Sequence, residues 1–119
     1  MLEILNFDHI LITVPPATSE AARDFYTKKL MLKEIPGEHP KGAIWIKLGN
    51  YEIHIREEEG HQSNSARHAA FAVKNLEEVK AFLVKKEIKI SYSTKIEGRE
   101  RLFFYDPWGN RFELIEYEG

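Results

Sequence analysis

The sequence predicts an α+β protein made of two βαβββ modules, whose strands form a curved, mostly antiparallel sheet with the helices outside. Alternating polar and apolar runs, which suit strands, are interrupted twice by a stretch of helical periodicity. The order strand, helix and three strands occurs once in each half. Matched residues also recur at nearly one offset: His68 follows His9 by 59 positions, and Gly109-Asn110 follows Gly49-Asn50 by 60. Such a repeat favours two related modules.

The first module is expected over about residues 5–57. Phe7–Val14 alternates and is rich in β-branched residues, so it predicts the first strand. Thr18–Leu32 predicts a helix, because apolar residues recur on one face and Thr18 or Ser19 can cap its start. Three further strands are expected at Lys33–Glu38, Ala43–Leu48 and Tyr51–Glu57.

The polar segment 58–66 predicts a linker, and the second module is expected over about residues 67–117. Together the modules make a single domain of residues 1–119. A helix is expected at Asn75–Lys86, where Asn75 and Glu78 have the spacing of a capping box. Strands are expected at Arg67–Val73, Ile88–Ser93, Arg101–Tyr105 and Arg111–Tyr117, with a turn at Asp106-Pro107-Trp108-Gly109-Asn110.

The composition of the chain excludes several classes of function. The chain is 43% hydrophobic with a formal net charge of −2, so it has the composition of a folded protein and no basic stripe for nucleic acid. Cysteine is absent, which excludes disulfides, thiolate ligands and cysteine nucleophiles and suits a reducing cytoplasm. The N-terminal run lacks the basic region of a signal peptide. We therefore expect a cytoplasmic protein with no membrane or nucleic-acid partner.

One carboxylate stands out. Glu113 lies between Phe112 and Leu114 in a strand, and an unpaired carboxylate in an apolar site is costly, so it must face water or have a strong partner. His9, His68 and Glu52 lie in other expected strands. Two histidines and two carboxylates on separate strands suggest a divalent metal site.

Strand alternation places these side chains on particular faces. His9 shares its face with Leu11, His68 with Ala70, and Glu52 with His54. Ala70 is small and would leave room for a ligand. If the two half-sheets curl into one cup, these faces line its interior.

Other polar and aromatic residues have simpler explanations. His39 and His61 are expected to be solvated, and the run Glu57-Glu58-Glu59 is expected to be a solvated strand end. Trp45 and Phe103 suit the core or a dimer contact, although they also suit the lining of a cup. Arg99 and Arg101 form a charged hairpin or reach a substrate carboxylate.

Several stretches together resemble the vicinal oxygen chelate superfamily, which includes glyoxalase I, bleomycin-resistance proteins and ring-cleaving dioxygenases. The similarity extends from Phe7 to Glu116. The stretches that carry it are Phe7-Asp8-His9-Ile10, Phe25-Tyr26, Arg67-His68-Ala69-Ala70-Phe71-Ala72-Val73, Phe104-Tyr105-Asp106-Pro107-Trp108-Gly109-Asn110 and Phe112-Glu113-Leu114. The resemblance implies the glyoxalase/bleomycin-resistance/dioxygenase fold.

The resemblance also implies one divalent metal ion per cup, namely Ni²⁺, Co²⁺, Mn²⁺, Fe²⁺ or Zn²⁺. Its ligands would be His9, Glu52, His68 and Glu113. Tyr51-Glu52-Ile53 resembles the family's carboxylate position, which favours Glu52, whereas His54 precedes Glu113 by the repeat offset of 59. Either residue could bind while the other lines the pocket.

The implied activity is that of a metal-dependent lyase, isomerase or epimerase acting on a small oxygenated substrate through a metal-stabilised enolate or oxyanion. Glu52 or Glu113 would move a proton as the general base. The resemblance further implies a homodimer. The substrate pocket is expected to include His54, Leu11, Ala70, Phe103 and Arg101.

Two alternatives remain open. One is a metal-free protein that binds and sequesters a small molecule, as bleomycin-resistance proteins do. The other is an Fe(II) ring-cleaving dioxygenase that uses only His9, His68 and Glu113. Fosfomycin modification is disfavoured, because Leu11 stands where those enzymes have Thr or Cys and the sequence ends at Gly119, before their C-terminal arginine.

Overall fold

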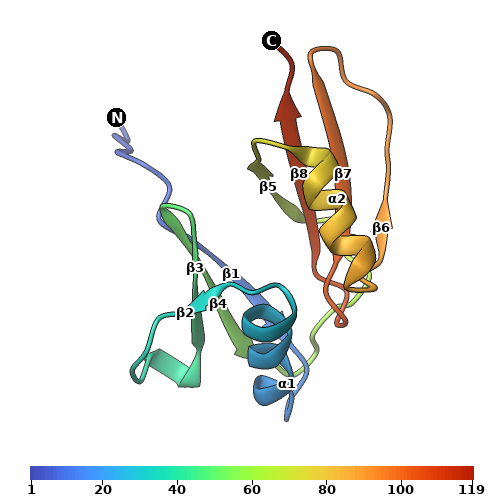
Figure 1. Ribbon diagram of the computed structural model, residues 1–119. Coiled ribbons are helices and arrows are strands. Elements are labelled where there is room, and N and C mark those ends of the chain that lie inside the picture. The colour runs from blue at the N-terminus through green and yellow to red at the C-terminus, as the bar shows by residue number, and fades with distance from the viewer. The chain divides into compact units, whose positions relative to one another are not determined.

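The computed structural model describes residues 1–119 and contains two compact units, residues 1–61 and 62–119. Each unit is a four-stranded sheet with a helix against one face (Figure 1). Each sheet contains one parallel and two antiparallel strand pairs, and neither is closed. The predicted α+β class and βαβββ order are confirmed.

In unit 1 the strand order is β1-β4-β3-β2. β1 pairs with β4 in parallel, with His9 opposite Glu52 and Leu11 opposite His54. β3 pairs antiparallel with β4 and places Trp45 opposite His54. The elements are β1 (His9–Val14), α1 (Ser19–Asp24), the π-helix η1 (Phe25–Lys29), β2 (Lys33–Glu34), the 3₁₀ turn η2 (Pro40–Gly42), β3 (Ile44–Leu48) and β4 (Tyr51–Glu57).

Unit 2 repeats this topology in the order β5-β8-β7-β6. β5 pairs with β8 in parallel, with His68 opposite Arg111 and Ala70 opposite Glu113. β7 pairs antiparallel with β8 and places Phe103 opposite Glu113. The elements are β5 (His68–Ala72), α2 (Leu76–Lys85), β6 (Ile90–Ser91), β7 (Arg99–Tyr105) and β8 (Arg111–Tyr117).

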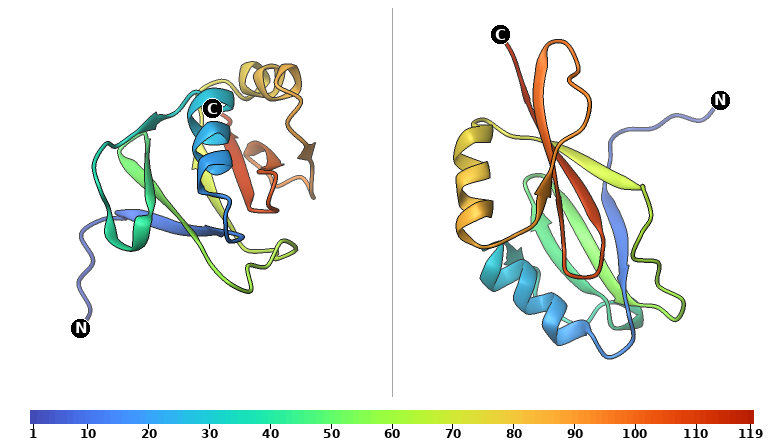
Figure 2. Two further views of the ribbon diagram at one scale, coloured as in Figure 1. Left: turned by 90° about the horizontal axis from the view of Figure 1, so that it is seen from below. Right: turned by 90° about the vertical axis from the view of Figure 1, so that its right-hand side faces the viewer.

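Several predicted boundaries were wrong. The predicted helix Thr18–Leu32 is α1 followed by the π-helix η1, which buries the consecutive residues Phe25 and Tyr26. The predicted strand Lys33–Glu38 shortens to β2, because Pro36 cannot donate a ladder hydrogen bond. The first strand begins at His9 rather than Phe7. The residues before it extend away from the sheet of unit 1 (Figure 2).

Each sheet has an apolar face that packs against its own helix, which leaves the opposite face for polar residues. In unit 1 the buried residues Ala22, Phe25 and Tyr26 of the helical segment provide this contact; in unit 2 Leu76 and Leu83 of α2 provide it. The apolar sheet residues beneath them are Ile12, Val14, Ile44, Ile46, Ile53 and Ile55 in unit 1 and Leu102, Phe104, Phe112 and Leu114 in unit 2. None of the helices has the length and hydropathy needed to cross a bilayer.

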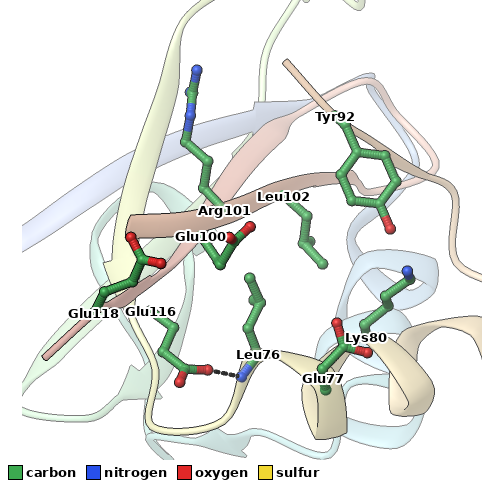
Figure 3. Close-up of a pocket in the computed structure, with 9 residues that line it drawn as sticks. All are labelled: Leu76, Glu77, Lys80, Tyr92, Glu100, Arg101, Leu102, Glu116 and Glu118. Carbon is green, nitrogen blue, oxygen red and sulfur yellow. Dashed lines mark hydrogen bonds between the residues drawn. The ribbon is translucent and has the colours of Figure 1, made fainter. Parts of the chain in front are cut away.

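A glutamate at the end of each central strand holds the start of the helix in the same unit. Oε2 of Glu57 accepts hydrogen bonds from the backbone N–H of Thr18 and Ser19, both at 3.0 Å, and from the Ser19 hydroxyl at 2.8 Å. In unit 2, Oε1 of Glu116 accepts from the Leu76 N–H at 2.6 Å (Figure 3). Glu57 is exposed at the end of β4, as expected, but its role in capping the helix was not foreseen. A helix start can be capped from a distant strand as well as from its own sequence.

Local capping differs between the two helices. Asn75 accepts from the Glu78 N–H at 3.1 Å, which confirms the predicted cap of α2. Thr18 occupies the cap position of α1 but makes no side-chain cap bond. The cap of α1 is thus supplied by Glu57, which sequence spacing alone cannot reveal.

We predict that Glu57→Gln lowers the stability of unit 1 in a pH-dependent way. Hydrogen bonds, above all from the Ser19 side chain, lower the pKa of the Glu57 carboxyl from 4.5 to about 2. A lowered folded-state pKa contributes stability that is present above pH 4.5 and is lost as the pH falls toward about 2. Thermal unfolding at pH 7 should therefore show a lower midpoint for Glu57→Gln, and the difference should shrink below pH 4.5. Glu59→Gln is the control, and an equal effect of both variants would contradict the capping role.

The turn between β7 and β8 is built around Asp106. Its Oδ1 accepts from the backbone N–H of Trp108 at 2.9 Å and of Asn110 at 2.8 Å, and the side chain is 4% exposed. Gly109 has φ +83°, and a Cβ built there would lie 2.0 Å from the backbone oxygen of Ser63. The turn therefore needs glycine both for its conformation and for its close approach to residue 63.

We predict that Gly109→Ala destabilises unit 2 more than Gly98→Ala does. Both glycines have a positive φ, +83° and +87°, so both substitutions carry a left-handed penalty of about 1–2 kcal/mol. A Cβ at Gly98 meets nothing within 4 Å, whereas one at Gly109 collides with the Ser63 backbone. The difference between the free energies of unfolding of the two variants, measured in urea, gives the cost of the collision. Equal losses of stability would show that residue 63 moves away at little cost.

Candidate functional site

Glu113 is buried in unit 2 and has two partners. It is 6% exposed and lies on the face opposite α2. Its Oε1 lies 3.0 Å from Nε2 of His68, and its Oε2 accepts from Nη1 of Arg101 at 3.2 Å. The sequence-based expectation that this carboxylate needs a strong partner is therefore met by one histidine and one arginine. Nδ1 of His68 faces the backbone oxygen of Ala66 at 3.0 Å, so this imidazole is held at both nitrogens.

Phe103 forms the apolar centre of the same face. It is 2% exposed, and the His68 ring meets it edge-on with centroids 5.2 Å apart. Two guanidinium groups also lie over this ring, that of Arg111 at 3.8 Å and that of Arg101 at 5.4 Å from its centroid. Arg111 was missed at the sequence level. Only the cross-strand register, which places Arg111 beside His68, reveals it.

In unit 1 four rings stack in one column. His9 and His54 have centroids 3.9 Å apart, His54 and Trp45 4.1 Å, and Trp45 and His39 4.0 Å, all within 15° of parallel. His54 is 8% exposed and its Nε2 lies 2.8 Å from Oε1 of Glu52. The expectation that His39 is solvated was wrong, because its ring covers Trp45 and its Nε2 lies 3.0 Å from the Ile35 oxygen.

The other residues predicted for the site have the following contacts and exposure within their own unit. His9 faces Asp8, with Nδ1 2.7 Å from Oδ1. Leu11 is 44% exposed and lies on the same face as His9. Ala70 is exposed and lies opposite Glu113 in the pairing of β5 with β8. His61, expected to be solvated, instead has Nδ1 2.6 Å from the Thr13 hydroxyl. No three histidine or carboxylate side chains within either unit are arranged to hold a metal ion.

The strand register shows which residue of β4, Glu52 or His54, corresponds to Glu113 of β8. His54 lies two residues beyond the partner of His9 in β4, and Glu113 lies two residues beyond the partner of His68 in β8. Glu57 and Glu116, which cap their helices, follow His54 and Glu113 by three residues. His54 is therefore the structural equivalent of Glu113, and Glu52 is the neighbour that hydrogen-bonds to it.

An open hollow of about 570 Å³ lies on this polar face of unit 1. Its lining includes His9, Glu52, His54, Trp45, Lys41 and Arg56. The two candidate metal ligands of β4 and the histidine of β1 thus share one surface with two cationic side chains. A hollow of this size can take a small molecule.

A smaller pocket of about 250 Å³ lies in unit 2 and is lined by residues of α2 and of the sheet face beneath it (Figure 3). Its charges are largely matched by the protein. Nζ of Lys95 lies 2.8 Å from Glu100 and 3.5 Å from Glu118. Lys80 lies 5.2 Å from the Tyr92 ring centroid, and its hydrogen bond with Tyr92 raises the Lys80 pKa. This pocket therefore offers a ligand few unmatched groups.

Comparison with known proteins identifies the family. Residues 6–114 match the profile of the Glyoxalase/Bleomycin resistance protein/Dioxygenase superfamily. The chain belongs to this superfamily. The superfamily commonly uses divalent metals, and its members bind small molecules. No curated protein sequence matches the chain significantly.

Solved structures of the superfamily fold agree with this assignment. A Bacillus anthracis protein assigned to the glyoxalase family is 32% identical, with a TM-score of 0.89 over 99% of both chains. The fosfomycin resistance protein FosX from Listeria monocytogenes is 19% identical, with a TM-score of 0.71 over 98% of this chain and 93% of its own. TnmS3, an antibiotic binding protein from Streptomyces, is 15% identical, with a TM-score of 0.77 over 99% of this chain and 100% of its own. The last two show a shared fold only.

We predict that Arg101→Met lowers the free energy of unfolding by roughly 1–3 kcal/mol, the usual cost of leaving a buried hydrogen-bonding group without one partner. Arg101 and Glu113 side chains are only 13% and 8% exposed, so water cannot readily replace the lost contact. Arg101→Lys should recover part of the loss because it keeps the charge. Urea unfolding of both variants tests this, and a Met variant as stable as the natural protein would show that His68 alone satisfies Glu113.

Proposed function

We propose that this protein is a divalent-metal-dependent enzyme of the glyoxalase type, a lyase, isomerase or epimerase, acting on a small substrate with neighbouring oxygen atoms. The proposed ligands are His9, His68, Glu113 and one of Glu52 and His54. The observation that carries the proposal is the way His9 and His68 are held. In both, Nδ1 faces an oxygen atom, Asp8 Oδ1 at 2.7 Å and Ala66 O at 3.0 Å.

This arrangement suits metal binding. Histidines that bind metals usually donate the other ring N–H to a carboxylate or a backbone carbonyl, which fixes the tautomer and leaves Nε2 as the ligand. Nε2 of His68 and Oε1 of Glu113 are 3.0 Å apart. Both atoms would be available to one bound ion. Two imidazoles with carboxylate oxygens suit Ni²⁺, Co²⁺, Mn²⁺, Fe²⁺ and Zn²⁺.

The chain's own groups would carry the proton transfer. A bound divalent ion supplies Lewis acidity toward substrate oxygen atoms. Glu52 and Glu113 are the proposed bases, because each has a carboxylate oxygen next to a histidine and each can accept a proton at that oxygen. Arg101, which donates to the second oxygen of Glu113, would hold that carboxylate in place while it changes protonation.

A second candidate is a metal-free protein that binds and sequesters a small molecule. The hollow of about 570 Å³ beside the ring column of His9, His54 and Trp45 favours it. The fold shared with the antibiotic binding protein TnmS3 is compatible with this function. The metal content of the protein separates the two candidates.

We predict about one divalent metal ion per chain in protein purified without a metal-affinity tag, and almost none in His68→Ala or Glu113→Ala. Elemental analysis gives the content, and titration with Ni²⁺, Co²⁺, Mn²⁺ and Fe²⁺ gives the affinity. Glu113→Gln is a second variant that keeps the side-chain volume. His61→Ala is the control and should retain the metal, because His61 contacts Thr13 and is not a proposed ligand.

The same measurement decides the fourth ligand. If His54 binds the ion, His54→Ala should lose most of the metal while Glu52→Ala loses less, and the reverse result assigns Glu52. Stoichiometric metal in both His68→Ala and Glu113→Ala would refute the proposed site. No metal in the natural protein, and none taken up on titration, would leave the sequestering function. If the natural protein contains metal, α-keto hemithioacetals, acyl-CoA thioesters and catechols are the substrates to screen first. Sedimentation of the same sample tests the expected homodimer.

A further inference from the structure

The hollow in unit 1 contains acidic groups that are already paired. Asp8 Oδ1 lies 2.7 Å from His9, and Glu52 Oε1 lies 2.8 Å from His54. Both carboxylates therefore face histidine nitrogens of the same surface, and they leave the cationic side chains of the lining without an acidic partner inside the hollow.

Lys41 is the first of these cationic groups. It lines the hollow and has no hydrogen bond, ion pair or ring contact within the protein. Its backbone is left-handed, with φ 57° and ψ 26°, in the turn Pro40–Gly42. A residue with a side chain pays an energetic cost in this conformation, and such costs concentrate at functional sites. The turn thus keeps a free ammonium group beside the hollow where a glycine would be less strained.

Arg56 and Trp45 supply further donors. Arg56 follows His54 by two positions, so strand alternation places it on the same face. Its closest acidic group is Glu58, with Nη2 and Oε1 3.7 Å apart, which is too long for a hydrogen bond. Trp45 contacts His54 and His39 through its ring faces, and its indole N–H has no acceptor in the protein.

We propose that this hollow binds the oxyanion end of a small ligand, a carboxylate or a phosphonate, through Lys41, Arg56 and the indole N–H of Trp45. Three donors that make no hydrogen bond within the protein, two of them charged, line one concave surface and suit such a group. The inference rests on the proposed function in one respect: His9, Glu52 and His54 of the proposed metal site border the same hollow. It narrows the substrate to a small anion with further oxygen atoms beyond its charged end.

The test is a titration of the metal-free full chain, followed by ¹H–¹⁵N correlation spectra. Acetate and methylphosphonate are the probes, and methylammonium is the control for charge sign. The protein has two tryptophans, so two indole signals report separately on Trp45 and on Trp108, and Trp45→Phe assigns them. We expect saturable movement of the Trp45 signal with an anion and none with methylammonium. The probe with the higher affinity identifies the preferred oxyanion.

Lys41→Met should weaken anion binding about tenfold or more, the loss expected on removing one hydrogen bond to a charged group. Lys33→Met is the matched control: Lys33 is an exposed lysine in β2 that does not line the hollow, so affinity should not change. Lys41→Gly removes the amine and also relieves the backbone, so it should be folded and still weak in binding. The inference would be overturned if the Trp45 signal did not move during the anion titration, or if Lys41→Met and Lys33→Met had equal affinity for the anion.

Metal content measured on these variants keeps the two proposals apart. Lys41→Met should retain the metal content of the natural protein, because Lys41 is not a proposed ligand. Anion binding without metal uptake would support the oxyanion site and contradict the metal-dependent function. Metal uptake without anion binding would support the metal-dependent function and contradict the oxyanion site.

Discussion

The central strand of each unit joins the helix to the site. β4 and β8 each carry two polar side chains three residues apart, His54 with Glu57 and Glu113 with Glu116. Because strand side chains alternate, such a pair points to opposite faces of the sheet. One member holds the start of the helix on the apolar face, and the other lies among the candidate ligands on the polar face. A shift of β4 or β8 by one residue would lose both contacts at once, so the helix contact and the site fix each other's register.

The polar face of each unit contains one buried polar residue, His54 in unit 1 and Glu113 in unit 2. Glu113 can remain in an apolar strand because a histidine and an arginine each take one of its oxygens. Unit 1 also pairs a histidine with a glutamate, His54 with Glu52, but no arginine contacts that carboxylate, and the His54 ring lies in a stack with His9 and Trp45. The two units thus share one topology and a histidine–glutamate pair, to which unit 2 adds an arginine and unit 1 adds ring stacking.

The sequence predicted the element order, the two repeated modules and the residues of the polar faces, because these depend on alternation and on the repeat offset. It did not predict contacts set by cross-strand register. The column from His9 to His39 needs β3 placed beside β4, and the cap from Glu57 joins residues 38 and 39 positions apart. Arg111 and Lys41 were missed for the same reason, since nothing in their local sequence marks them. The choice between Glu52 and His54 was left open, and the register makes His54 the equivalent of Glu113 without deciding which residue binds metal.

The π-helix has a consequence for how the two halves are compared. A π-turn accommodates one residue more than an α-turn, and Phe25–Lys29 adopts it where unit 2 has regular α-helix. A residue-by-residue alignment carried forward from His9 and His68, which differ by 59, is already out by two residues at the helix starts, because Ser19 and Leu76 differ by 57. The π-turn adds a further difference within the helix, so an exchange of helices between the halves must adjust the length both before the helix and inside it.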